Sequence, residues 1–289
     1  MRRIEARLAV VLFILFLYGC GRTDSLVVGS KNFTEQVILG EMAAQQLERK
    51  LHTKVERKLN LGGTLLAHEA LVKGDIDIYP EYTGTASSVV LKRSIPPDPA
   101  QAYIEVKDQY LQRFQVVWLP PLGFNDTFAM VVRTADAEKL PRQDLSNAHA
   151  RTWQLGVGYE FLTRPDGFRS LNHVYGLRWE GTPRTMDLGL LYQALRQRKI
   201  DMAAANSTDA QLTQNGYAVL ADDKHAFPPY SACFLARKSV VQQQPGVEMA
   251  LTMLSNHITA ETMRDLNRRV DVEHQPVVAV VRDFLATQK

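Results

Sequence analysis

Short apolar segments alternate with longer amphipathic ones over the first half of the chain, and this alternation constrains the fold most strongly. Three stretches have the length and pattern of strands: 26–28, 55–59 and 76–78. The segments between them predict helices over about 34–50 and from the glycine pair at 62–63 to Gly74. Strands that alternate with helices in this way indicate an α/β protein whose sheets are mostly parallel.

Capping patterns predict where two of these helices begin. Asn32 and Glu35 have the spacing of a capping box, which would start the first helix. Asp98 followed by Pro99 has the pattern of an N-cap with proline at the first helical position. We expect that helix to run to about Arg113, and we expect the chain beyond Pro245 to be largely helical.

A short repeat indicates two halves of similar build. Residues 70–77 and 194–201 both read Ala-Leu, four residues, then Ile-Asp. In each, a helix with its Ala-Leu pair on the buried face would lead into a strand. Tyr82 and Asn206 lie five residues beyond the two aspartates and would be equivalent positions. Coincidence explains the match equally well, because both dipeptides are common.

The first 19 residues predict an export signal. Arg2, Arg3 and Arg7 precede an apolar run of ten residues, 8–17, which is too short to span a membrane. The following Tyr-Gly-Cys resembles the bacterial lipoprotein cleavage box and predicts Cys20 as the lipidated first residue of the mature chain. Plain secretion with an incidental Cys20 is the alternative. Either way we expect an extracytoplasmic protein, and the lipid would anchor it to a membrane surface.

Cysteine content and net charge further restrict which class of protein this chain can be. If Cys20 is lipidated, Cys233 has no partner for an intramolecular disulfide, so core burial must stabilise the fold. A chain of 289 residues is long enough for two lobes of ordinary size. Removal of residues 1–19 lowers the net charge from +3 to +1, and no basic stripe is present. We therefore expect no nucleic-acid partner.

The sequence lacks the common motifs of enzymes and metal sites. There is no Gly-x-Ser-x-Gly, His-Glu-x-x-His or Cys-x-x-Cys, and the seven histidines contain no i, i+4 pair. Asp75, Asp77 and Glu81 form an acidic cluster without the spacing of an EF-hand loop. Asp77 and Asp201 read more simply as strand-end caps. We expect no catalysis, cofactor or metal; an envelope enzyme is the less favoured alternative.

Two segments at predicted strand ends carry groups suited to a small cation or zwitterion. They are Ser-Lys-Asn-Phe-Thr-Glu-Gln at 30–36 and the stretch 74–85. Ligands bind at this edge of open α/β sheets. A quaternary ammonium has no N–H to donate, so aromatic faces hold it best, whereas a carboxylate needs Lys, Arg or hydroxyl donors. Ring pairs at 79 and 82, 124 and 128, and 227 and 230 fit such a cage, although each ring also fits core packing.

Together these motifs resemble the substrate-binding proteins of osmoprotectant ABC transporters, which take glycine betaine, choline, carnitine and related quaternary amines. The resemblance runs from about Ser25 to Phe284 and rests on ordered motifs: 30–36, 74–85, 123–128, 186–190, 207–209, 222–224 and 228–230. It implies a two-lobed periplasmic-binding-protein fold of type II. Each lobe would be a mixed, mostly parallel sheet flanked by helices, with the ligand in the cleft between them.

The resemblance also implies a domain layout and partners. Lobe 1 would comprise residues 25–124 plus 229–289, and lobe 2 residues 125–228. Gly123–Phe128 and Phe227–Tyr230 read as the crossings between them. The protein would deliver a quaternary amine or betaine to an ABC permease and, through it, to ATPase subunits. We expect a monomer by analogy with the class.

Carried over position by position, the resemblance assigns ligand-binding roles. Tyr82, Phe128 and Tyr230 would form the aromatic cage, and Asp126 would lie beside the cationic head. The ligand carboxylate would meet three residues: Lys31, Thr85 and Arg164.

Asn206 departs from the family, which tends to have tyrosine there and also at position 128. One missing cage ring predicts binding weaker by about 1–2 kcal/mol, or roughly 5- to 30-fold, or a differently shaped cationic head. The alternatives are another small amine or amino acid as ligand, or a ligand sensor that docks on a membrane signalling protein.

Overall fold

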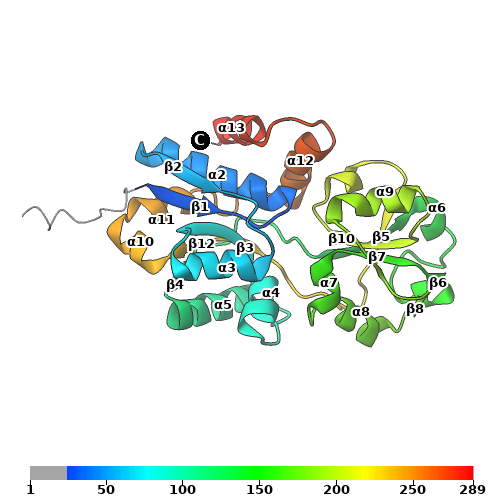
Figure 1. The fold of residues 1–289 in the computed structure, drawn as a ribbon. Coiled ribbons are helices and arrows are strands. Elements are labelled where there is room, and N and C mark those ends of the chain that lie inside the picture. Colours follow the sequence, from blue (N-terminus) through cyan, green and yellow to red (C-terminus); the bar gives the residue numbers. More distant parts are fainter. Residues whose placement is uncertain (1–24, 289) are drawn as a thin grey trace, which may run out of the picture.

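The computed structural model describes residues 25–288 and arranges them in two lobes (Figure 1). The strands are β1 (Leu26–Gly29), β2 (Val55–Lys58), β3 (Ile78–Tyr82), β4 (Val116–Trp118), β5 (Phe128–Arg133), β6 (Thr152–Trp153), β7 (Leu155–Val157), β8 (Arg178–Trp179), β9 (Arg184–Thr185), β10 (Met202–Asn206), β11 (Tyr217–Leu220) and β12 (Ala232–Arg237). One lobe is built on the sheet β2-β1-β3-β12-β4 and the other on the sheet β11-β5-β10-β7-β9. The predicted two-lobed α/β fold is confirmed.

Helices flank both sheets. They are α2 (Thr34–Leu51), α3 (Thr64–Lys73), α4 (Thr83–Thr85), α5 (Pro99–Phe114), α6 (Thr134–Ala137), α7 (Tyr159–Thr163), α8 (Phe168–Tyr175), α9 (Leu191–Arg196), α10 (Lys238–Gln243), α11 (Gly246–Thr252), α12 (Ala260–Asp271) and α13 (Val277–Thr287). Successive strand residues point to opposite faces of the first sheet. Val28 and Ile78 belong to the same apolar cluster as Ile38 of α2, whereas Val27 and Tyr79 pack with the side of α3 and α5.

The sequence repeat is a structural repeat. Ala70 O accepts hydrogen bonds from the backbone N–H groups of residues 75 and 76, and Ala194 O accepts from those of residues 199 and 200. Asp77 then accepts from Val27 N at 3.0 Å, and Asp201 accepts from the equivalent Gln154 N at 3.3 Å. The two aspartates therefore bind the backbone of the neighbouring strand in the same way.

Strand order extends this equivalence to the whole sheets. Read from β9, the second sheet is β9-β7-β10-β5-β11, and it matches β2-β1-β3-β12-β4 strand for strand, including which pairs are parallel and antiparallel. Each aspartate is also paired with an arginine at the end of the equivalent strand, Arg237 in β12 and Arg133 in β5. Tyr82 and Asn206, the last residues of β3 and β10, are therefore equivalent.

Two adjacent segments connect the lobes. Asn125 and Ser231 form an isolated antiparallel bridge, and Asp126 N donates to Tyr230 O at 3.1 Å. Gly123 precedes the bridge with φ of 117°, and a Cβ atom there would lie 2.9 Å from the Asn256 Cα. The predicted crossings at 123–128 and 227–230 thus lie side by side between the sheets.

Some local expectations are wrong and others are confirmed. The capping box is wrong, because α2 has Phe33 in extended conformation as its N-cap and no side-chain cap bond. Asp98 does cap α5, since its side chain accepts from Gln101 N at 2.8 Å. The strand expected at 76–78 begins only at Ile78. The predicted signal and Cys20 lie outside the described residues, and within 25–288 no helix is both long and apolar enough to cross a membrane.

Candidate functional site

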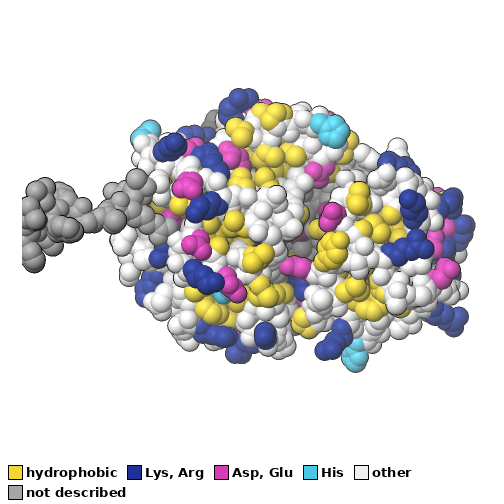
Figure 2. Space-filling view, viewed as in Figure 1, with side chains coloured by type: hydrophobic (Ala, Val, Ile, Leu, Met, Phe, Trp, Pro, Cys, Tyr) yellow, Lys and Arg dark blue, Asp and Glu magenta, His cyan; other side chains and the backbone are white. Residues whose placement is uncertain are grey.

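A cavity of about 570 Å³ lies between the two lobes. All eight residues predicted to bind ligand line it: Lys31, Tyr82, Thr85, Asp126, Phe128, Arg164, Asn206 and Tyr230. Figure 2 shows acidic and apolar side chains along the seam between the lobes. The fold therefore brings together residues that are up to 199 positions apart in the sequence. Their role in binding a ligand stays a prediction.

Aromatic rings form two groups at this cavity. Phe128 opens β5, and its ring contacts Phe161 and Tyr230 edge to face at centroid distances of 4.9 and 5.6 Å. Tyr82 ends β3 and stacks on Phe33 at 6.5 Å. Both groups reach the cavity, so ring faces are available from strand ends of both lobes and from the crossing segment.

Protein cations already lie over both groups of rings. The Arg164 guanidinium carbon is 5.0 Å from the Phe128 centroid and 5.6 Å from that of Tyr230. Lys31 Nζ is 4.8 Å from the Tyr82 centroid. These contacts show that ring faces at the cavity already hold positive charge supplied by the protein.

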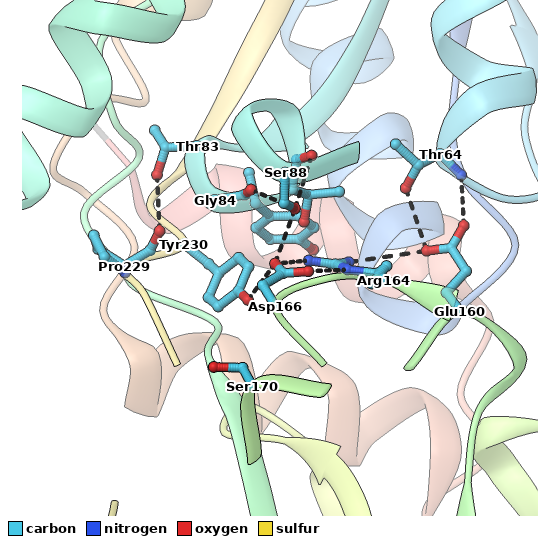
Figure 3. A network of polar contacts seen from close by, with 12 residues as sticks. Thr64, Thr83, Gly84, Ser88, Glu160, Arg164, Asp166, Ser170, Pro229 and Tyr230 are labelled. Carbon is cyan, nitrogen blue, oxygen red and sulfur yellow. Dashed lines mark hydrogen bonds and ion pairs between the residues drawn. The ribbon is translucent and has the colours of Figure 1, made fainter. Parts of the chain in front are cut away.

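Both cations are anchored by buried carboxylates. Lys31 Nζ lies 2.6 Å from Glu81 Oε1, and both side chains are less than 5% exposed. Arg164 donates from Nε and Nη2 to the two oxygens of Asp166 at 3.0 and 2.7 Å (Figure 3). Burial acts to raise the pKa of Asp166, but the Arg164 hydrogen bonds and charge hold it below its usual value. Because these pairs fix both positive groups, a ligand carboxylate would meet cations with set orientations.

Three further carboxyl groups face the cavity from different elements. Glu35 lies in the first turn of α2, Asp126 precedes β5, and Asp209 follows β10. Burial raises the pKa of Asp126 well above its usual range, and the nearby charge of Glu35 raises it further. Burial also raises the pKa of Asp209 to about 7. Glu35, Asp126 and Asp209 thus form an acidic side of the cavity, and Lys31 is close enough to act on Glu35.

Hydrogen bonds join the lobes around the cavity. Glu160 of α7 accepts from Thr64 N at 2.9 Å and from Thr64 Oγ1 at 3.3 Å (Figure 3). Ser88 donates to Asp166 at 2.9 Å, again across the two lobes. The N-cap of α3 is a glycine, Gly63, so the carboxylate that satisfies the start of this helix comes from the opposite lobe. The lobes are therefore in a closed arrangement.

The comparisons with known proteins agree with this geometry. Residues 24–287 match the OpuAC family, described as the substrate binding domain of ABC-type glycine betaine transport system. The chain belongs to this family. The predicted family is confirmed, and it is a family of transport binding proteins rather than enzymes.

Individual relatives span different shares of their own length. The chain is 35% identical over 294 residues to the "Ergothioneine transport permease/ergothioneine binding protein EgtU" of Helicobacter pylori, covering 98% of this chain but only 52% of that protein. It is 34% identical over 297 residues to the "Glycine-betaine-binding protein" of Pseudomonas aeruginosa, covering 99% and 94%. A solved glycine betaine/carnitine/choline ABC transporter structure aligns with a TM-score of 0.76 at 29% identity, covering 91% and 98%.

Several residues at the cavity of this OpuAC-family chain were not predicted from the sequence. They are Phe33, Glu35, Glu160, Phe161, Thr208, Asp209 and Asn267. Most of them belong to the motifs on which the family resemblance rests. Their closeness in sequence to the predicted residues was therefore the one feature that could have identified them as site residues. Asn267 in α12 had no such signal, because only folding brings this helix to the cavity. Among residues 25–288, no group of three or more potential ligands could hold a metal ion.

Proposed function

We propose that the chain is the extracytoplasmic receptor of an ABC importer for a quaternary ammonium ligand of the glycine betaine or choline type. The supporting observation is the inter-lobe cavity, which combines ring faces of Tyr82, Phe128 and Tyr230 with the buried carboxyl group of Asp126. A quaternary ammonium can use both, since its diffuse charge needs no hydrogen-bond acceptor.

The distribution of charge supports an orientation for a zwitterion. Its carboxylate lies toward Arg164 and Lys31, with Thr85 as a hydroxyl donor. Asp166 engages Nε and Nη2 of Arg164, whereas Nη1 is 3.9 Å from its nearest acidic partner, Glu160. The ammonium lies toward the acidic side, beside Asp126. Closure of the lobes then seals the ligand from water, and the closed form delivers it to the permease.

Calorimetric titration of the chain from Gly21 onward tests this function. Glycine betaine, choline and carnitine are titrated in turn, with proline as a control that carries a carboxylate but no quaternary ammonium. We expect saturable binding of at least one quaternary amine and silence with proline. Binding of proline alone, or of none of the quaternary amines, contradicts the proposal.

Ergothioneine is a second candidate ligand, favoured by the acidic side of the cavity. It carries a trimethylammonium group and a carboxylate, and also a ring with N–H donors that glycine betaine lacks. Glu35, Asp126 and Asp209 offer acceptors for such donors. At position 206 the cavity has the amide of Asn206 in place of an aromatic ring. Including ergothioneine in the same titration decides between the two: tighter binding than glycine betaine favours it, and absence of binding rejects it.

We propose Cys20 as the site of lipid attachment, on the evidence of the export signal that precedes it. Metabolic labelling with a fatty acid in a bacterial host should mark the protein, and the label should be absent from Cys20→Ala.

Uptake of a radiolabelled quaternary amine by cells that also carry the cognate permease tests delivery. A receptor that binds ligand but supports no uptake would point to the sensor role instead.

A further inference from the structure

One hydroxyl group connects two carboxyl groups at the acidic side of the cavity. Thr208 Oγ1 is 2.5 Å from Glu35 Oε2 and 2.7 Å from Asp126 Oδ1. A threonine hydroxyl has a single hydrogen and can donate only once. The second of these short contacts therefore needs a hydrogen from the carboxyl side. These contacts require one proton on the pair of carboxyl groups of Glu35 and Asp126.

The other contacts indicate which group carries it. Two further donors stabilise the ionised form of Glu35: Tyr82 Oη donates to Oε1 at 2.6 Å, and Asn267 Nδ2 donates to Oε2 at 3.2 Å. Among residues 25–288, the carboxyl group of Asp126 has one other hydrogen-bond contact besides the Thr208 hydroxyl, the long one from Thr208 N at 3.4 Å. Asp126 thus donates to Thr208, which donates to Glu35. Burial raises the pKa of both carboxyl groups, in agreement with a retained proton.

The surroundings supply more negative than positive groups. Asp209 faces the pair from the end of β10 and is held by Tyr192, and Asp271 adds a further carboxyl group from α12. The positive charge of Lys31 acts on Glu35, but the Lys31 ammonium is engaged by Glu81. In the described part of the chain, the proton therefore occupies a place where positive charge is needed.

We propose that a ligand with a permanent positive charge displaces this proton, so that capture of a quaternary amine releases a proton. The inference rests on the proposed function and names how the same site is regulated. The Asp126 O–H bond breaks, its electron pair stays on the oxygen, and the proton passes to buffer. The ionised Asp126 then faces the ligand cation, whose charge takes over the role of the proton between the carboxylates.

Calorimetry in buffers with different ionisation enthalpies measures the number of protons released. Below the pKa of the empty pair, we expect roughly one proton per bound glycine betaine or choline, and an affinity that rises about tenfold per pH unit before it levels off. Binding without proton release, or with an affinity independent of pH, would overturn the inference.

Four variants identify the source of the proton. Asp126→Asn should abolish release. Thr208→Val should keep it, because the Thr208 hydrogen bonds lower the pKa of both carboxyl groups and their loss favours the proton, and Thr208→Ser, which retains the bridging hydroxyl, should behave as the wild type. Asp187→Asn is the control, because Asp187 is an exposed carboxyl group at the same cavity and the substitution removes a carboxyl group by the same chemical change. Release that persists in Asp126→Asn, or disappears in Asp187→Asn, contradicts the assignment.

Infrared spectroscopy of the ligand-free protein gives a readout that needs no ligand. A protonated carboxylic acid has a carbonyl band separate from those of carboxylates. We expect this band in the wild type at a pH above 7, where Asp209, whose pKa is raised to about 7, is mostly ionised and contributes little to it. It should be lost in Asp126→Asn and kept in Asp187→Asn. If no quaternary amine binds, the proposed function fails while this band still tests the shared proton; its absence from the wild type would refute the inference alone.

Discussion

Asn206→Tyr is the most informative single substitution at the cavity. Asn206 ends β10 directly opposite Phe128 in β5, so side chains at these two positions stand next to each other on one face of the sheet. The repeat makes it the equivalent of Tyr82, whose ring contacts a cation at 4.8 Å in the other lobe. A tyrosine at 206 would therefore add a ring beside Phe128 and complete the cage from the second lobe.

The expected gain follows from one added cation–ring contact. Such a contact contributes about 1–2 kcal/mol when desolvated, which corresponds to binding that is roughly 5- to 30-fold tighter. The new side chain extends into a cavity of about 570 Å³ from a partly buried position, so the protein need not repack. The backbone contact from Asn206 N to Asp209, at 3.2 Å, does not depend on the side chain.

Calorimetric titration with glycine betaine and choline measures the effect, and Asn206→Leu is the matched control. Leucine adds apolar bulk without a ring face, so only the tyrosine should tighten binding. A tyrosine variant that binds no better than the leucine variant would refute the reasoning about a missing ring. Tighter betaine binding together with weaker ergothioneine binding would show that the amide position makes room for a larger ligand.

Three further predictions concern two other residues of the cavity and the buried carboxylate of Asp136, which contacts three cationic side chains. Arg164→Ala should weaken the binding of glycine betaine at least tenfold more than that of choline, as measured by calorimetry. The reason is that glycine betaine would lose a charge-assisted contact worth about 1.5–3 kcal/mol, whereas choline has no carboxylate; equal losses would contradict the assignment of Arg164 to the carboxylate. Glu160→Ala should weaken the binding of every ligand by a similar factor, because it removes from the closed form only the oxygen acceptors that cap α3, worth about 0.5–2 kcal/mol; a ligand-selective loss would contradict this. In Asp136, burial acts to raise the pKa, but Lys139, Arg133 and Arg151 lower it to about 2. The ionised Asp136 therefore stabilises the fold above pH 3.8, and this contribution is lost as the pH falls through about 2. Asp136→Asn should lower the free energy of unfolding by about 1–3 kcal/mol at neutral pH and leave it unchanged below a pH of about 2. Chemical denaturation at the two pH values measures the difference.

Local patterns predicted most of the fold because they depend on neighbouring residues. The alternation of strand and helix segments, the Asp98 cap and the repeat of residues 70–77 and 194–201 all reappear in the structure. Glu35 shows where such reasoning stops. Its spacing from Asn32 fits a local cap, yet its carboxyl group instead accepts from Tyr82 and Thr208, which are 47 and 173 positions away.

The positions of the site residues were easier to predict than their partners. The eight residues assigned by resemblance all line one cavity. The sequence did not indicate that Arg164 lies over Phe128 and is held by Asp166, or that Lys31 is paired with Glu81. These contacts depend on side-chain orientation and on how the elements pack within each lobe, and neither is encoded in the spacing of a motif.

The repeat explains how one fold can select its ligand by a few substitutions. The chain reads Tyr-Thr-Gly-Thr at 82–85, from the last residue of β3 onward, and Asn-Ser-Thr-Asp at 206–209, from the last residue of β10 onward. Equivalent corners of the two lobes therefore face the same cavity. The backbone holds both corners alike: Thr83 N donates to Ser231 O at 3.1 Å and Ser207 N to Thr127 O at 2.9 Å. One corner therefore offers a ring where the other offers an amide, a hydroxyl and a carboxyl group. We expect a ligand that fits between them to bring a cationic head to the rings and either charge or N–H donors to the acidic corner. The absence of a ring at position 206 should therefore change selectivity rather than the fold.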